Sequence, residues 1–146
     1  MRAIHFAYPA KLEPDEDGEY IVSFRDLPEA LTSGHDEREA LAEAADCLDE
    51  AIAGRINRGD DIPQPSPPRK GEQRVAVPAH TAAQAALYLA MRATGISKSE
   101  LARRLGCDVR EARRLLDPRH PSKIERPEAA LAALGGVLEV GYWKMA

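Results

Sequence analysis

Residues 101–116 read LARRLGCDVREARRLL, and this stretch decides the architecture of the C-terminal part of the chain. Ser97 and Asp108 each stand three residues before a glutamate, which is the spacing of a capping box at a helix start. Gly106 can take the left-handed conformation that ends a helix. The stretch therefore predicts two short helices that meet at a three-residue turn.

This arrangement resembles the repressor-type helix-turn-helix. A small residue such as Ala102 is needed where the helices cross, and Gly106 relaxes the turn. Cys107, Ala112 and Leu115 would then seat the second helix against the first. The face left for the major groove of DNA consists of Asp108, Val109, Arg110, Glu111, Arg113 and Arg114.

Arginine is the side chain best shaped to bind guanine O6 and N7 together, and each such pair discriminates by roughly 1–3 kcal/mol. Arg110 and Arg114 lie four residues apart, on one helical face, and are the expected base readers. Arg113 is expected at a base or a phosphate. Asp108 is expected to cap the helix rather than to contact a base.

Arginine-rich solvated helix faces are common, so this pattern has an alternative explanation without DNA. The turn glycine, two capping boxes and local positive charge coincide within twenty residues, which favours DNA binding. Three flanking cations, Lys98, Arg119 and Lys123, are expected at phosphates. The candidate DNA-binding residues are Lys98, Ser99, Asp108, Val109, Arg110, Glu111, Arg113, Arg114, Arg119 and Lys123.

The helices around this motif complete an all-α unit over residues 79–146. A helical stripe over 82–94 ends at Gly95, and residues 127–134 predict a further helix that ends at Gly135. Residues 137–143 (VLEVGYW) are mostly apolar and predict a short terminal strand.

A proline-rich segment marks the end of the first unit. Four prolines within residues 63–68 exclude a helix interior and a central strand, so residues 62–71 should run extended on the surface. Val75 and Val77 then alternate with neighbours that are expected to be more exposed, and they predict an edge strand that returns to the first sheet. The first domain is therefore expected to span residues 1–78, with the proline-rich segment inside it.

The N-terminal unit begins with the period-two pattern of a strand. Ile4, Phe6, Tyr8, Ala10 and Leu12 alternate, residues 14–18 supply turn chemistry, and apolar residues alternate again over 20–24. This pattern predicts a β-hairpin, and residues 31–33 predict a third short strand.

An amphipathic helix is expected to follow, with Asp36 as its N-cap and a C-terminal end near Gly59. Its expected inward face is Leu41, Ala44, Ala45, Leu48, Ile52 and Ile56. The predicted fold is thus α+β: a small antiparallel βββαβ sheet with one packed helix, followed by the helix-turn-helix domain.

The charge of the chain divides at the same boundary. Residues 1–78 hold 9 basic and 17 acidic side chains, whereas residues 79–146 hold 11 basic and 7 acidic ones. The balances are −8 and +4 within a total of −4, so the two parts should meet different partners.

Composition excludes several protein classes. With 44% hydrophobic and 30% charged residues the chain is globular, and no apolar run approaches the roughly 20 residues of a membrane span. A cytoplasmic protein without a membrane partner is expected. Cys47 and Cys107 are far apart and are expected to be small buried side chains, so no disulfide, metal or cofactor is expected.

Several segments together resemble the HicB antitoxin family. They are residues 8–18 (YPAKLEPDEDG), 20–28 (YIVSFRDLP), 60–66 (DDIPQPS), 114–124 (RLLDPRHPSKI) and 130–135 (ALAALG). The likeness spans nearly the whole chain. It departs at Glu29-Ala30-Leu31, where many members carry a Gly-Cys pair, so the local turn is expected to differ.

The resemblance implies that residues 1–78 form a partial ribonuclease H-like domain that binds and masks HicA. HicA is a small basic ribonuclease toxin of double-stranded-RNA-binding fold that cleaves messenger RNA with a histidine. It further implies that residues 79–146 bind operator DNA, as a homodimer or a dimer of dimers. The apolar residues of the tail and the first domain are both open as dimer surfaces.

An acidic surface can compete with RNA for a basic toxin. Solvated acidic faces are also common, so the individual residues are candidates only. The candidate toxin-binding residues are Asp15, Glu16, Asp17 and Glu19 at the hairpin and Glu43, Asp46, Asp49 and Glu50 on the helix.

Two alternatives have different consequences. A nuclease of ribonuclease H type needs carboxylates that converge on two Mg²⁺ ions, whereas these acids cluster in a turn and along a helix face. The four histidines, His5, His35, His80 and His120, form no catalytic set, so no enzyme and no catalytic residue is expected. The remaining alternative is a stand-alone helix-turn-helix regulator whose first domain senses a ligand or another protein.

Overall fold

The computed structural model describes residues 2–145. The chain divides into two compact units, residues 1–82 and 83–146, and the division falls within the first turn of helix α2 (Ala79–Thr94). Across the described residues, no helix combines the length and apolar character needed to cross a membrane.

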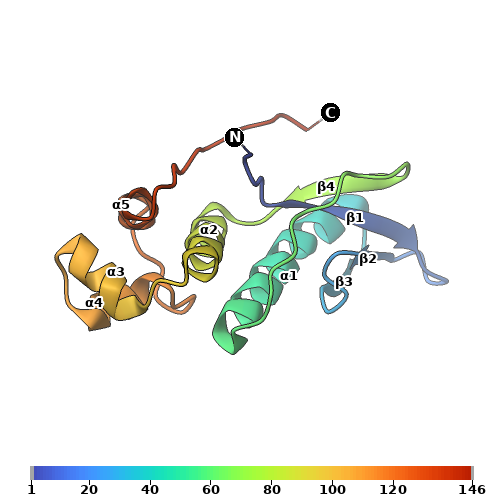
Figure 1. Cartoon of the computed structure of the whole chain (residues 1–146). Helices are drawn as coiled ribbons and strands as arrows, with labels where there is room; N and C mark the ends of the chain where they lie inside the picture. The colour runs from blue at the N-terminus through green and yellow to red at the C-terminus, as the bar shows by residue number, and fades with distance from the viewer. Residues whose placement is uncertain (1, 146) are drawn as a thin grey trace. The chain divides into compact units, whose positions relative to one another are not determined.

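The first unit is built on a four-stranded antiparallel sheet. Its strands are β1 (Ala7–Pro14), β2 (Tyr20–Phe24), β3 (Leu31–Gly34) and β4 (Glu72–Ala76), and they lie in the order β3-β2-β1-β4 (Figure 1). Leu12 pairs with Val22 in the hairpin, and Val22 pairs with Thr32 on the other side. The predicted βββαβ order and the return of the last strand to a sheet edge are confirmed.

The turn between β1 and β2 is closed by its own first residue. Asp15 Oδ1 accepts hydrogen bonds from the backbone amides of Asp17 at 2.8 Å and Glu19 at 2.9 Å. Gly18 takes φ +83°, which a residue with a side chain rarely adopts. The hairpin predicted from alternation and turn chemistry is therefore present.

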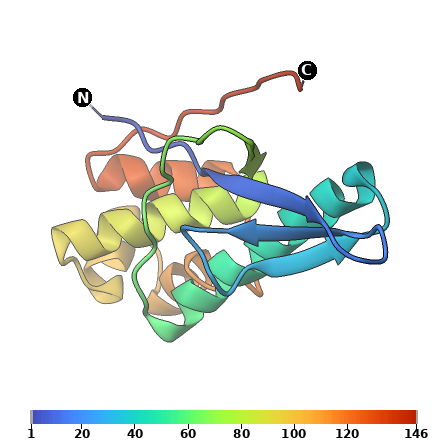
Figure 2. The same ribbon diagram turned by 90° about the vertical axis from the view of Figure 1, so that its right-hand side faces the viewer.

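Helix α1 (Glu37–Arg58) lies across one face of this sheet (Figures 1 and 2). Asp36 caps its start by accepting from the Glu39 amide at 2.8 Å, and Gly59 ends it in the left-handed conformation, as predicted. The buried face differs slightly from the expected one, because Leu41 and Ala45 are only half-buried. The buried residues are Ala40, Ala44, Leu48, Ala51, Ile52 and Ile56.

The proline-rich segment runs without regular secondary structure and is held by side chains of the sheet unit. Tyr8 Oη donates to the Pro63 carbonyl at 2.7 Å, and Asp26 accepts from the backbone amide and the hydroxyl of Ser66, each at 2.8 Å. Burial raises the pKa of the Tyr8 phenol above its ordinary value, so this donor keeps its proton. The segment is thus a fixed strap and not a flexible linker.

The first strand begins later than predicted. It starts at Ala7, while Ile4 is 37% exposed and Phe6 is half-buried. The reason is the length of its neighbours: β2 ends opposite Ala10 and β4 ends opposite Ala7. One further backbone bond joins the two segments, from the Val77 amide to the Phe6 carbonyl at 2.9 Å. The next residue, Pro78, has no amide to continue the pairing.

Two other expectations are wrong. Cys47 and Cys107 are only partly buried, because one lies at the border of the buried face of α1 and the other in the turn after Gly106. Residues 137–145 form neither helix nor strand, since no described strand pairs with them. Val137, Val140 and Tyr142 are instead exposed.

The second unit contains the remainder of α2 and the helices α3 (Lys98–Leu105), α4 (Val109–Leu115) and α5 (Glu125–Ala133). The last helix starts two residues before the predicted position, with Pro127 inside its first turn, where a missing amide costs little. The unit's buried side chains include Leu87, Leu101, Ala102, Ala112, Leu115, Ala130 and Leu131.

Candidate nucleic-acid interface and acidic surface

The helix-turn-helix is formed by α3, the turn at residues 106–108 and α4. Gly106 takes φ +67°, and the Cys107 amide donates to the Ala102 carbonyl at 3.0 Å. Ala102 and Ala112 are almost completely buried where the two helices cross. Asp108 accepts from the Glu111 amide at 2.8 Å, so its predicted capping role is confirmed.

Three arginines project from α4. Arg110, Arg113 and Arg114 are all exposed, and none of them forms an ion pair or side-chain hydrogen bond with any residue between 2 and 145. Their guanidinium groups therefore keep all of their donors for an external acceptor.

The two arginines of α3 are in a different state. Arg103 Nη2 lies 2.5 Å and Arg104 Nε 3.1 Å from Glu100 Oε1, and Arg104 also donates to the Ala133 carbonyl at 3.2 Å. The hydrogen bonds from Arg103 and Arg104 lower the pKa of Glu100 to about 2. These arginines thus tie α3 to its own first turn and to the end of α5.

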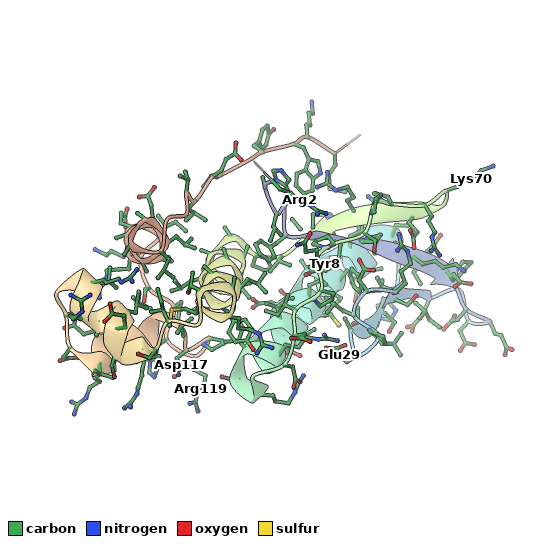
Figure 3. The ribbon with its side chains drawn as sticks, viewed as in Figure 1. Arg2, Tyr8, Glu29, Lys70, Asp117 and Arg119 are labelled. Atoms are coloured by element: carbon green, nitrogen blue, oxygen red, sulfur yellow. The ribbon has the colours of Figure 1, made fainter. Side chains whose placement is uncertain are left out.

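The loop after α4 holds another paired cation. Arg119 Nε lies 3.4 Å from Asp117 Oδ1, and the two residues are neighbours in Figure 3. The backbone amide of Arg119 also donates to this carboxylate, which lowers the pKa of Asp117. Lys98, Ser99 and Lys123 are exposed.

Sequence reasoning missed one contact of the α4 face that is expected to enter the major groove of DNA. Arg126 Nη2 of α5 lies 3.5 Å from Glu111 Oε2 of α4, so the acid of this face has a cation beside it. The 15-residue separation gives no periodic signal. The pairs of Glu100, by contrast, have the three- and four-residue spacing that would have indicated them.

The acids of the hairpin turn do not all face solvent freely. Asp15 is used by the turn itself, and Glu19 lies 2.8 Å from His35 Nδ1. Glu16 and Asp17 are exposed. The Glu19 contact joins the turn to the residue before the N-cap of α1.

The acids of α1 separate into two groups. Glu43, Asp46 and Glu50 are exposed at three- and four-residue spacing, and we call them the acidic row. Asp49 lies apart, because its carboxylate accepts from the Thr81 hydroxyl and lies 4.0 Å from His80 Nε2. Sequence reasoning had no signal for this engagement, since the partners are about thirty residues away.

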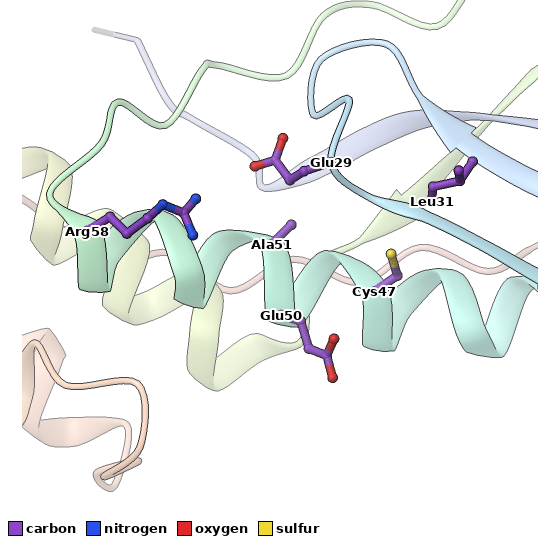
Figure 4. A pocket seen from close by; sticks show the side chains of 6 residues that line it. All are labelled: Glu29, Leu31, Cys47, Glu50, Ala51 and Arg58. Carbon is purple, nitrogen blue, oxygen red and sulfur yellow. The ribbon is translucent and has the colours of Figure 1, made fainter.

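A shallow cavity of about 260 Å³ opens beside the acidic row (Figure 4). Glu29 at its rim accepts from Arg55 Nε at 2.6 Å, which lowers the pKa of Glu29. The lining residues are Glu29, Leu31, Cys47, Glu50, Ala51 and Arg58. Within the described part of the chain, no three His, Cys, Asp or Glu side chains cluster as a metal site requires.

Comparison with known proteins identifies the family. The family described as "HicB_like antitoxin of bacterial toxin-antitoxin system" matches residues 7–86. "Antitoxin HicB 2" of Photorhabdus laumondii is 44% identical over 133 residues, which cover 91% of this chain and 94% of that protein. "Antitoxin HicB" of Escherichia coli K12 is 38% identical over 133 residues, 91% of this chain and 96% of the relative.

A third relative, "Antitoxin HicB" of Pseudomonas fluorescens, is 35% identical over 137 residues and again covers 91% of both chains. These likenesses include the helix-turn-helix as well as the sheet unit, because the matched lengths exceed either unit. The chain therefore belongs to the HicB-like antitoxin family of bacterial toxin–antitoxin systems.

Proposed function

We propose that this protein neutralises a HicA-like ribonuclease by direct binding and represses its own operon by binding operator DNA. The likeness to HicB antitoxins over 91% of the chain supports the proposal most strongly, because it extends over both units. We assign toxin binding to residues 1–78 and DNA binding to residues 79–146. The proposed action is stoichiometric binding and not catalysis.

The charge of the first unit supports the toxin-binding half. A ribonuclease must hold RNA phosphates with cationic side chains. The acidic row presents three carboxylates without partners among residues 2–145. The cationic surface of a ribonuclease can bind these carboxylates in place of RNA phosphates. Such an acidic surface speeds encounter and opposes the approach of RNA.

The second unit supports the DNA-binding half. Arg110, Arg113 and Arg114 lie on the second helix of a helix-turn-helix, the element that enters the major groove in this motif, and their guanidinium groups have no partner among the described residues. In a two-fold dimer the two such helices would lie about 34 Å apart and read a palindromic site.

Co-expression tests the toxin-binding half. The HicA-like ribonuclease encoded beside the gene should stop growth when expressed alone, and this chain should restore growth. Failure to restore growth, with both proteins present at equal levels on an immunoblot, contradicts neutralisation. If the chain restores growth but does not bind DNA from the promoter, the antitoxin role stands and repression of the operon is contradicted.

The alternative function, a stand-alone regulator, predicts DNA binding without rescue of growth. It would bind promoter DNA with the same arginines, yet it would neither bind nor inhibit the ribonuclease.

A further inference from the structure

The two edges of the sheet differ in how they are protected against pairing. Edge strand β4 carries Glu72 and Arg74, and Glu72 accepts from Arg25 Nε at 2.9 Å. Arg25 also donates to the Pro67 carbonyl of the strap at 2.6 Å. Charged side chains and a covering segment are the usual defences of an exposed edge.

Edge strand β3 is short, with four residues, and it lacks the other two defences. Its sequence is Leu-Thr-Ser-Gly, without a charge or a proline. Leu31 is 64% exposed, and Ile21 on the neighbouring strand is 40% exposed. Leu31 and Ile21 share one face of the sheet, because Leu31 pairs with Ser23 and Ser33 pairs with Ile21.

The cavity of Figure 4 lies where β3 begins, since Leu31 is part of its lining. Its volume of about 260 Å³ is below the range of roughly 300–1,000 Å³ for small-molecule sites. It therefore suits one side chain of a partner better than a cofactor.

The charges around the cavity determine which type of partner side chain fits it. Glu29 is paired with Arg55, and Arg58 is paired with Asp60 at 2.8 Å. Glu50 has no hydrogen bond or ion pair within the described chain, so one carboxylate is left over. Burial raises the pKa of the Cys47 thiol, which keeps this neighbour neutral and leaves Glu50 as the surplus negative charge of the cavity.

We propose that β3 accepts an edge strand of the ribonuclease partner and that this strand places a lysine or arginine in the cavity against Glu50. The inference rests on the proposed function and adds the surface through which it acts. Backbone hydrogen bonds to an open sheet edge supply affinity, and side-chain pockets beside the edge supply specificity.

A second copy of this chain fits the same edge less well. Two-fold pairing of β3 with its copy would bring two acidic rows toward one interface, and the nearby cations Arg55 and Arg58 are already paired with Glu29 and Asp60 of their own chain. A cationic partner meets the same carboxylates with opposite charge. The surplus carboxylate thus favours a ribonuclease strand over self-association.

The test compares two lysine substitutions at the two edges. Leu31→Lys adds a positive charge to the uncharged edge strand, on the exposed face that Leu31 shares with Ile21, and should therefore repel a cationic strand that pairs with β3. Ala76→Lys adds the same charge at an exposed position of β4. Affinity for the purified ribonuclease should fall about tenfold or more for Leu31→Lys and stay unchanged for Ala76→Lys.

A labelling experiment on the unmodified chain gives an independent readout. Ribonuclease binding should slow alkylation of Cys47, which lines the cavity, and should leave alkylation of Cys107 in the second unit unchanged. Circular dichroism of the Leu31→Lys variant excludes a folding defect. If that variant does not fold, the Cys47 labelling decides the question.

Each outcome has a distinct meaning. Equal affinity of the Leu31→Lys and unmodified chains, or unchanged Cys47 labelling in a formed complex, overturns the proposed surface and leaves the proposed function intact. Protection of Cys47 in the absence of ribonuclease, with a doubled mass in solution, shows a second copy at β3 and also overturns it. No binding of ribonuclease by the unmodified chain overturns both proposals.

Discussion

The carboxylate of Asp108 accepts a hydrogen bond from the backbone amide of Glu111 at 2.8 Å, and this bond defines the first turn of α4. The turn carries Arg110, and the next carries Arg113 and Arg114. The cap therefore sets the position from which all three arginines project.

Removal of this cap is expected to loosen α4. Asp108→Ala should cost about 1 kcal/mol of local stability, whereas Asp108→Ser should keep most of it, because serine also accepts from the third amide. Hydrogen exchange of the Glu111 amide measures the effect directly. Equal exchange rates in the alanine and serine variants would contradict the capping role.

The arginines of α4 are expected to differ from the flanking lysine in their effect on DNA. Arg110→Ala and Arg114→Ala should each cost about 1–3 kcal/mol on the operator and relax base preference. Lys123→Ala should weaken binding to every sequence alike and reduce the salt dependence.

Fluorescence anisotropy on operator and scrambled duplexes across a salt series separates these effects. Arg58→Ala is the matched control, since this arginine is paired with Asp60 in the other unit. Affinities that do not change with salt would reject the assignment, because phosphate contacts release counterions.

Glu100 is expected to stay ionised in strongly acidic solution. The hydrogen bonds from Arg103 and Arg104 lower its pKa from 4.5 to about 2. Because the folded chain has the lower pKa, this carboxylate stabilises the fold above pH 4.5 and loses that contribution as the pH falls through about 2.

An NMR titration of the Glu100 carboxyl carbon measures this pKa. Replacement of both Arg103 and Arg104 by alanine should return the pKa toward 4.5. An unchanged midpoint in that double variant would show that the two arginines do not cause the shift.

Two glycines of the first unit should respond to alanine in opposite directions. A Cβ at Gly34 would lie 2.7 Å from Ala40 Cα, so Gly34→Ala should destabilise the unit by roughly 1–3 kcal/mol. The atoms nearest to a Cβ at Gly54 are those at the end of the flexible Arg58 side chain, and Gly54→Ala should stabilise α1 by about 1 kcal/mol. Urea unfolding of both variants checks the signs. Loss of stability in both would contradict the account of Gly54.

Local patterns in the sequence predicted most of the fold correctly. The capping residues Asp36, Ser97 and Asp108 all accept the predicted amide, because a cap depends only on residues within one turn. Strand length was not predictable in this way, since the start of β1 depends on where β2 and β4 end. The strand predicted for residues 137–143 is absent for the same reason, because apolar residues alone do not supply a neighbouring strand to pair with.

In the candidate site, too, features that depend on local sequence were predictable and features that depend on tertiary packing were not. Exposure of Arg110, Arg113 and Arg114 followed from helical period. The pairs Asp49 with Thr81 and Glu111 with Arg126 depend on tertiary packing, and nothing in the local sequence indicated them. The cavity beside β3 likewise arises from two segments that meet only in the folded chain.

The central claim is that this chain inhibits a ribonuclease by binding it. Titration of the purified HicA-like ribonuclease with the full chain, with cleavage of a labelled RNA as readout, tests that claim most directly. We predict that cleavage falls linearly to zero at a fixed molar ratio and that the inhibition weakens at high salt. Undiminished cleavage at a tenfold excess of folded chain would contradict it.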